Sequence, residues 1–100
     1  MVMTTTYDRG AAIQKLGELV FDTIAELDWD GETTLDFDSA QGIELRNAAM
    51  NVSRLIGNDP PLLAAARAMA KTIIEWIWEM KTFADVKNAS RTYEEQRLLK

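Results

Sequence analysis

The sequence predicts an all-α protein, a small antiparallel helical bundle with three main helices and a short C-terminal fourth. Over long stretches apolar residues recur at steps of three and four, the spacing that places them on one face of a helix. Residues typical of helix ends separate these stretches, among them Gly57, Asp59 and Pro60. Because the chain has 100 residues, of which 47% are apolar and 27% charged, we expect one globular domain over residues 1–100.

The first helix is expected from about residue 8 to residue 27. Its inward stripe consists of apolar residues at steps of three and four: Ile13, Leu16, Val20, Ile24 and Leu27. Gly17 lies on this stripe, where glycine costs about 1 kcal/mol against alanine. We therefore expect another helix to approach the backbone closely at Gly17.

A second helix is expected over about residues 39–56, with Asp38 as its N-cap and Gln41 three positions later to complete a capping box. Its apolar residues at core spacing are Leu45, Ala48, Ala49, Val52, Leu55 and Ile56. The turn that follows, at residues 57–60, is short. A short turn of this kind predicts that the second and third helices run antiparallel.

The third helix is expected over about residues 60–86. Its predicted core face lies within about 60° of Leu62 on a helical wheel and comprises Leu62, Ala66, Met69, Ile73, Trp76, Ile77, Met80, Phe83 and Ala84. Trp78 falls at about 160° on the same wheel. We therefore expect Trp76 to pack inward and Trp78 to face away from the core.

Beyond Val86 the helical spacing of apolar residues fails, because charged and polar residues would occupy the core face of a continued helix. We expect a break near residues 88–90, followed by a short fourth helix over about residues 92–99. Thr92 and Glu95 have the spacing of a capping box for this helix.

The chain contains neither cysteine nor histidine, which removes thiolate nucleophiles, Ser-His-Asp triads and ordinary sulfur or imidazole metal sites. Carboxylates do stand one helical turn apart, as in Glu75 with Glu79 and Glu18 with Asp22. On a polar helix surface such pairs are tolerated repulsions of a few tenths of a kcal/mol. We therefore expect no enzymatic activity, no metal and no cofactor.

The N-terminal residues lack the basic start and apolar segment of a signal peptide, and no apolar run approaches the roughly 20 residues that span a bilayer. We expect a cytoplasmic protein, of a bacterium or a host cell, with no membrane partner. The net charge is −5, and no dense stripe of lysine and arginine is present, so direct binding of nucleic acid is not expected. A basic protein surface is the better partner.

An acidic connection over residues 28–38 follows the first helix and contains Asp28, Asp30, Glu32, Asp36 and Asp38. The spacing of the first three resembles a calcium-binding loop, but Gly31 stands at the fourth position instead of the sixth, and Ser39 replaces the glutamate of the twelfth. Three interpretations stay open besides calcium binding: a solvated connection whose Leu35 and Phe37 pack into the core, a surface for a basic partner, and a short strand within the segment.

The outward face of the third helix is the candidate partner-binding site and comprises Arg67, Lys71, Ile74, Glu75 and Trp78. An exposed tryptophan beside an aliphatic residue and long basic side chains has the composition of an interface hot spot. Trp78 has two other interpretations, since the fourth helix or the acidic connection would cover it within the monomer, and a second copy of the chain would cover it in a homo-oligomer.

These observations favour a small protein-binding module that acts by occupying a surface of another protein. Short, acidic helical proteins of this kind are common among phage and mobile-element inhibitors of host proteins, which is an analogy at the level of the fold alone. One alternative is a structural homo-oligomer assembled through the third helix. Another is a nucleic-acid mimic, in which regularly spaced acids imitate phosphates.

Overall fold

The computed structural model describes residues 9–55 and 61–99. They form four helices: α1 (Arg9–Asp30), α2 (Ala40–Ser53), α3 (Pro61–Ile77) and α4 (Phe83–Leu98). The described residues contain no strand, so the all-helical class is confirmed and the short strand considered within the acidic connection is absent there.

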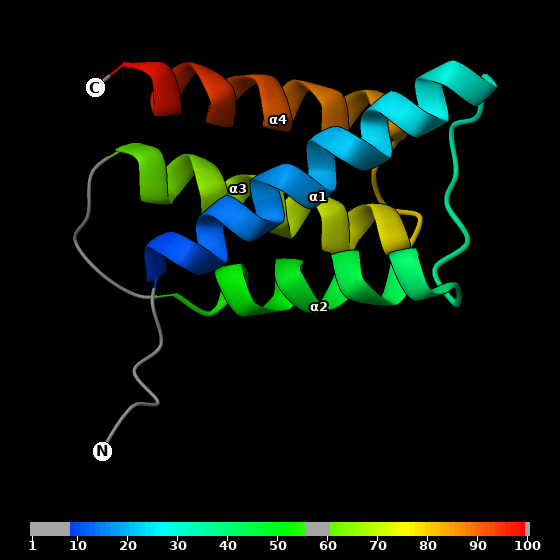
Figure 1. Ribbon diagram of the computed structural model, residues 1–100, viewed down its shortest axis with the longest axis horizontal. Helices are drawn as coiled ribbons and strands as arrows, with labels where there is room; N and C mark the ends of the chain where they lie inside the picture. The colour runs from blue at the N-terminus through cyan, green and yellow to red at the C-terminus, as the bar shows by residue number, and fades with distance from the viewer. Residues whose placement is uncertain (1–8, 56–60, 100) are drawn as a thin grey trace.

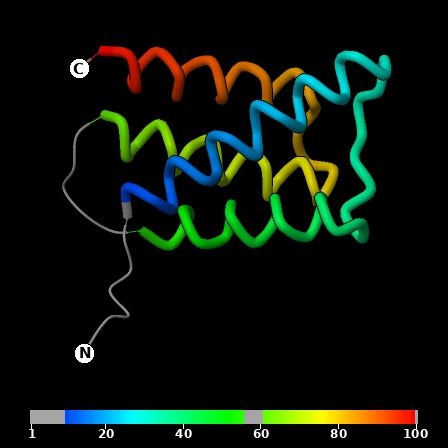
Figure 2. The backbone as a smooth tube through the Cα atoms, viewed as in Figure 1, coloured from blue at the N-terminus to red at the C-terminus, as the bar shows by residue number. Residues whose placement is uncertain are grey.

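Successive helices run in alternating directions along the molecule (Figure 1). Helix α3 lies between α2 and α4. Helix α1 crosses one face of the layer that these three helices form and contacts all of them (Figure 2). Because the direction alternates, the α1–α2 connection and the α3–α4 turn lie at the same end of the molecule. Two segments that are distant in the sequence therefore become neighbours.

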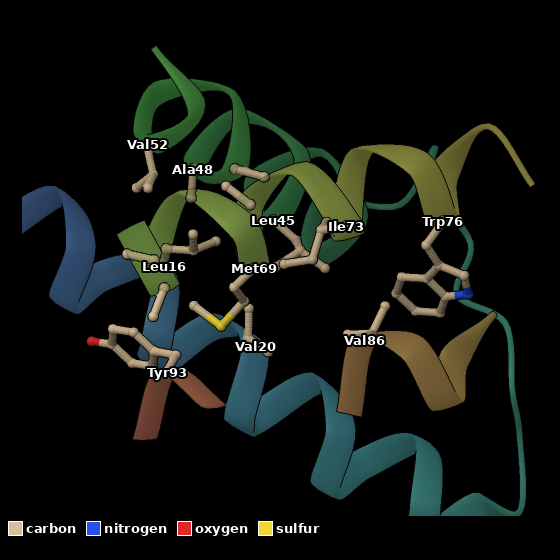
Figure 3. Packing of buried hydrophobic residues seen from close by; sticks show 14 of the residues in the cluster. Leu16, Val20, Leu45, Ala48, Val52, Met69, Ile73, Trp76, Val86 and Tyr93 are labelled. Atoms are coloured by element: carbon tan, nitrogen blue, oxygen red, sulfur yellow. The ribbon is translucent and has the colours of Figure 1, made fainter. Parts of the chain in front are cut away.

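Side chains from all four helices meet in one hydrophobic cluster (Figure 3). The largest fully buried ones come from the first three helices and are Leu16, Val20, Leu45, Val52, Met69 and Ile73. Trp76 is also buried, as predicted. The apolar spacing therefore identified the inward faces of α1, α2 and α3.

Gly17 permits a close contact between α1 and α4, which confirms the expected approach of another helix. A Cβ atom at this position would lie 2.9 Å from Cε2 of Tyr93. The Tyr93 ring is buried, and its centroid is 6.2 Å from that of Phe21 on α1. The absence of a side chain at Gly17 thus makes room for the tyrosine ring.

Helix α1 extends to Asp30, three residues beyond its predicted end at Leu27. Glu32 N–H donates to the carbonyl of Leu27 at 2.8 Å, and Gly31 N–H donates to the carbonyl of Asp28 at 3.3 Å. Gly31 has a φ of 70°. This arrangement is a Schellman motif, which satisfies the last carbonyls of a helix and favours glycine at the left-handed position.

The predicted N-cap of the second helix is wrong by one residue. Ser39, and not Asp38, caps α2, because its Oγ accepts the N–H of Gly42 at 3.0 Å. The Gln41 side chain does not complete a capping box. It donates instead to Thr23 Oγ1 at 3.4 Å and to a carboxylate oxygen of α1 at 3.3 Å, and so links α2 to α1.

The C-terminal end of the second helix lies at Ser53, before the predicted end at residue 56. Leu55 follows it and is buried in the core, as predicted. The helix-end signals at residues 57–60 and Ile56 lie outside the described residues. Helix α3 begins directly after this segment, at Pro61.

The third helix ends at Ile77, well before the predicted residue 86. Met80 N–H donates to the carbonyl of Glu75 at 2.7 Å, and Glu79 N–H donates to the carbonyl of Trp76 at 3.0 Å. Glu79 has a φ of 61°. Helix α3 therefore ends with the same hydrogen bonds as α1, but with glutamate in the left-handed position. Neither glycine nor proline marks this ending in the sequence, which explains the overlong prediction.

The fourth helix is not short. It covers Phe83–Leu98, which is 16 residues, so the predicted break near residues 88–90 and the predicted helix over residues 92–99 are wrong. The new start changes the phase of the helix, and the residues that it buries are Phe83, Val86, Ser90 and Tyr93. Ala84, predicted on the core face of the third helix, is exposed as a consequence.

A capping box starts α4, but at different residues from those predicted. Thr82 Oγ1 accepts the N–H of Asp85 at 3.2 Å, and Asp85 Oδ2 accepts the N–H of Thr82 at 2.9 Å. The hydrogen bonds from the Thr82 backbone and side chain lower the pKa of Asp85 below its ordinary value. Thr92, predicted to pair with Glu95, lies inside the helix, where its hydroxyl donates to the carbonyl of Asn88 at 3.2 Å.

Candidate interaction surface

The net charge of the chain is concentrated at the end of the bundle where α1 and α3 terminate (Figure 1). Residues 28–38 and 78–87 make this end, and they hold seven acidic residues and two lysines, a net charge of −5. The whole chain also has a net charge of −5, so its other residues balance to zero. We call these two segments together the acidic end.

Contacts between the two segments hold the acidic end together. Lys87 Nζ lies 3.1 Å from Asp28 Oδ1 and 5.2 Å from the centroid of the Phe83 ring. The Phe37 ring meets the Trp76 ring edge to face, with centroids 5.1 Å apart. The ion pair therefore links the last turn of α1 to α4, and the aromatic contact links the α1–α2 connection to α3.

The α1–α2 connection packs directly against the first turn of α2. A Cβ atom on Gly42 would lie 2.3 Å from the carbonyl oxygen of Asp36 and 2.6 Å from the Cα of Phe37. The connection is also ordered locally, because the N–H of Asp38 donates to Asp36 Oδ1 at 2.9 Å. Leu35 and Phe37 pack against the core cluster, as expected from the sequence. Two half-buried anchors thus hold a segment whose acids face water.

The predicted acidic surface residues are all exposed: Asp28, Asp30, Glu32, Asp36 and Asp38. The structure places the first two in the last turn of α1 and the others in the connection. Among the residues that the structure describes, no group of three or more acidic side chains is arranged to hold a metal ion.

Three large apolar side chains are exposed at the same end. The exposed fraction is 90% for Trp29, 72% for Trp78 and 69% for Met80. The outward orientation of Trp78 is as predicted, and no described part of the chain covers it. The prediction that Met80 packs inward is wrong, because the backbone leaves the helical path at Glu79.

Sequence reasoning missed Trp29 as an exposed side chain. The signal was present, since a helix continued to Asp30 places Trp29 about 200° around the axis from the buried Leu27. Because the predicted helix ended at residue 27, the position of Trp29 on the helix was not considered. The two exposed tryptophans therefore both lie at a helix end: Trp29 is one residue before the last residue of α1, and Trp78 is one residue after the last residue of α3.

The residues of the predicted partner-binding face of α3 do not form one exposed surface in the structure. Arg67 and Lys71 are exposed, but Ile74 is half-buried and packs against the core cluster. Glu75 is also half-buried. Arg67 lies roughly 16 Å from Trp78 along the helix axis. Trp78 therefore belongs to the acidic end, apart from the basic residues with which it was grouped.

An open groove with a volume of about 1000 Å³ crosses the acidic end. It lies between the α1–α2 connection and the α3–α4 turn, and its apolar lining comprises Leu35, Phe37, Trp76, Ile77 and Phe83. Its charged lining comprises Asp28, Glu32, Glu79, Lys81 and Lys87. The groove combines an apolar surface with carboxylates of both segments.

A second groove of about 540 Å³ lies between α1 and α4 and includes Gly17, Phe21 and Tyr93. Burial raises the pKa of the Tyr93 hydroxyl. Arg97, which also lines this groove, is paired with Glu94 on its own helix. The lining also includes Glu18 of α1, whose carboxylate accepts a hydrogen bond from the Gln14 side chain at 3.2 Å.

The carboxylate pairs considered as catalytic groups do not form a common site. Glu79 lies beyond the end of α3, so it does not share a helical face with Glu75. Glu18 and Asp22 remain on the solvent face of α1.

Searches against protein-family models, curated proteins and solved structures found no match to this chain. None of the described helices combines the length and the apolar character needed to cross a membrane.

Proposed function

We propose that the protein is a binding module that docks its acidic end onto a basic surface of another protein and changes that protein's activity by occupying the surface. The observation that carries this proposal is the joint location of the whole net charge and of Trp29, Trp78 and Met80 at one end of the bundle. Tryptophan side chains contribute disproportionately to the binding energy of protein interfaces.

The stability of the bundle does not account for these residues. Asp28 and Asp30 stand in the last turn of α1, where the helix dipole disfavours a negative charge by about 0.3–1 kcal/mol. Lys87 offsets this for Asp28 by pairing with it. Trp29 and Trp78 leave large apolar surfaces in water. A binding role explains why acidic and aromatic side chains gather where they do not stabilise the fold.

The chemistry of the surface favours arginine and lysine on the partner. Carboxylates accept charge-assisted hydrogen bonds from guanidinium groups, often in pairs. An indole face attracts a cation with about 0.5–1 kcal/mol at an exposed site and about 2 kcal/mol once water is excluded. The groove, which Ile77 and Glu79 help to line, offers an apolar surface for the aliphatic part of a basic side chain or for a neighbouring apolar residue. A protruding basic segment fits all three features.

The test is affinity capture of partners by the wild type beside two double variants, followed by calorimetry with the captured protein. Trp29→Ala with Trp78→Ala should weaken binding at least about tenfold, because it removes the aromatic anchors. Leu98→Ala with Leu99→Ala is the matched control, since these side chains are 67% and 72% exposed but stand at the C-terminal end of α4, the last residue of the helix and its C-cap. Equal losses of affinity in both double variants would contradict the proposal.

Nucleic-acid mimicry is a second candidate because the charge is concentrated on one surface. A mimic should lose binding as salt is added and in the combined variant Asp28→Asn, Asp30→Asn and Asp36→Asn, yet tolerate Trp78→Ala. The proposed docking predicts a smaller dependence on salt and a clear loss with Trp78→Ala. Titration of the captured partner at low and high salt separates the two candidates.

A structural homo-oligomer is the remaining candidate, with the exposed Trp78 covered by a second copy of the chain. It predicts a wild-type oligomer that dissociates in Trp78→Ala. Light scattering across a hundredfold range of protein concentration measures this directly. A monomeric wild type would instead leave Trp78 available to a different protein.

A further inference from the structure

We propose that two copies of this chain exchange their α4 helices by opening the turn at residues 78–82. In the exchanged dimer, α3 and α4 of each chain form one continuous helix, and each α4 packs on α1 and α3 of the other copy. The turn at residues 78–82 belongs to the acidic end, but this inference rests on the conformation of the turn and the packing of the core, and it does not require the docking proposed above.

The first argument is the conformation of the turn. Glu79 has a φ of 61°, a left-handed conformation that is unfavourable for a residue with a Cβ atom. Residues 78–82 contain neither glycine nor proline. Glutamate, methionine and lysine, which occupy residues 79–81, are all good helix formers. The local sequence therefore favours a helix at the position where the monomer makes a turn.

The second argument is the apolar spacing across the turn. A helix continued beyond Ile77 would place Met80 on the same face as Ile73 and Trp76. Phe83 would follow on that face one turn later. In the monomer the Met80 side chain is 69% exposed, so this face is interrupted. The helix that the sequence pattern predicts across residues 78–82 is thus a second conformation available to the same residues.

The third argument is that exchange preserves the core. Phe83, Val86 and Tyr93 are the large buried residues of α4, and all three find the same environment in the partner copy. The equilibrium between the monomer and the exchanged dimer then depends on the conformation of the turn and on protein concentration. The monomer keeps the hydrogen bonds that end α3 and the capping box of Thr82 with Asp85, whereas the dimer gains helical hydrogen bonds and releases the left-handed conformation of Glu79.

The experiment uses two variants that act on the turn in opposite directions. Glu79→Gly removes the disfavoured conformation from the monomer, so the dissociation constant of the dimer should rise about tenfold or more, since two turns open when each dimer forms. Thr82→Ala with Asp85→Ala removes the capping box from the monomer, so the dissociation constant should fall by a similar factor. Light scattering gives the dimer fraction after concentrated protein has been warmed to just below its unfolding temperature and cooled.

A spectroscopic measurement distinguishes exchange from association of intact monomers. The backbone carbon chemical shifts of Glu79 should change from left-handed to right-handed helical values in the dimer. A dimer in which these shifts stay left-handed, or which is lost in Trp78→Ala but unaffected by Glu79→Gly, overturns the proposal. So does a chain that stays monomeric after this treatment in the wild type and in the folded Thr82→Ala, Asp85→Ala variant.

Discussion

Helices α1 and α3 end with the same hydrogen bonds but with different residues in the left-handed position. Gly31 has a φ of 70°, and Glu79 has a φ of 61°. Glycine adopts this conformation readily, whereas glutamate requires support from the surrounding structure. The comparison teaches that a helix can end at a left-handed residue without a glycine at that position.

The support for the Glu79 ending comes from the residues on either side of the turn. The rings of Trp76 and Phe83 stack across it, with centroids 5.7 Å apart and an angle of 27° between their planes. Both residues are buried. The capping box of Thr82 starts the next helix at once. Burial of an aromatic pair and a good N-cap thus hold a turn that its own residues do not favour.

The largest expected effect follows removal of an aromatic ring from this turn. Trp76→Ala should destabilise the protein by about 3–5 kcal/mol, because Trp76 is buried and supports both Phe37 and Phe83. Trp78→Ala is the matched control two residues away and should lower stability much less, because its side chain is exposed. Chemical denaturation measures both. Similar losses in the two variants would show that the ending of α3 depends on something other than the buried stack.

Substitutions at the two left-handed positions should have opposite signs. Gly31→Ala should destabilise by about 1 kcal/mol, an effect of the backbone alone because nothing lies within 4 Å of the added Cβ atom. Glu79→Gly should be neutral or stabilise by up to about 1 kcal/mol, because relief of the left-handed conformation is partly offset by the greater freedom of glycine in the unfolded chain. Denaturant midpoints measure both changes. A clear destabilisation by Glu79→Gly would mean that the glutamate side chain itself supports the turn.

The smallest expected effect is a dependence of stability on pH through the capping box of α4. The pKa of Asp85 is lower in the folded protein than its ordinary value of 3.8. The ionised carboxylate therefore stabilises the fold above pH 3.8, and this contribution is lost as the pH falls through the folded pKa. Asp85→Asn should reduce the acid-induced loss of stability relative to the wild type. Thermal unfolding between pH 6 and pH 2.5 provides the comparison, and parallel curves would exclude this contribution.

The sequence predicted the features that depend on local spacing. The helical class, the inward faces around Leu16, Leu45 and Met69, the close approach at Gly17 and the outward direction of Trp78 all follow from periodicity. These features require only that a segment be helical and that one face be apolar. They remained correct even where the predicted helix ends were not.

The features that the sequence did not predict depend on contacts between distant segments. Aromatic packing between Trp76 and Phe83 holds the α3–α4 turn. The turn therefore does not need a glycine or a proline, and neither residue marks it in the sequence. The acidic end forms because residues 28–38 and 78–87 meet, as in the ion pair of Asp28 with Lys87. Periodicity along one helix contains no information on which ends of different helices become neighbours. The groove and the concentration of charge therefore emerge only in the folded chain.

Because the helices alternate in direction, the two ends of the helical bundle differ in what they carry. Helix α1 begins, and helix α4 ends, at the end of the bundle opposite the acidic one (Figure 1). A tag, a carrier domain or a solid support attached beyond either end of the chain would therefore leave Trp29, Trp78 and the carboxylates pointing outward.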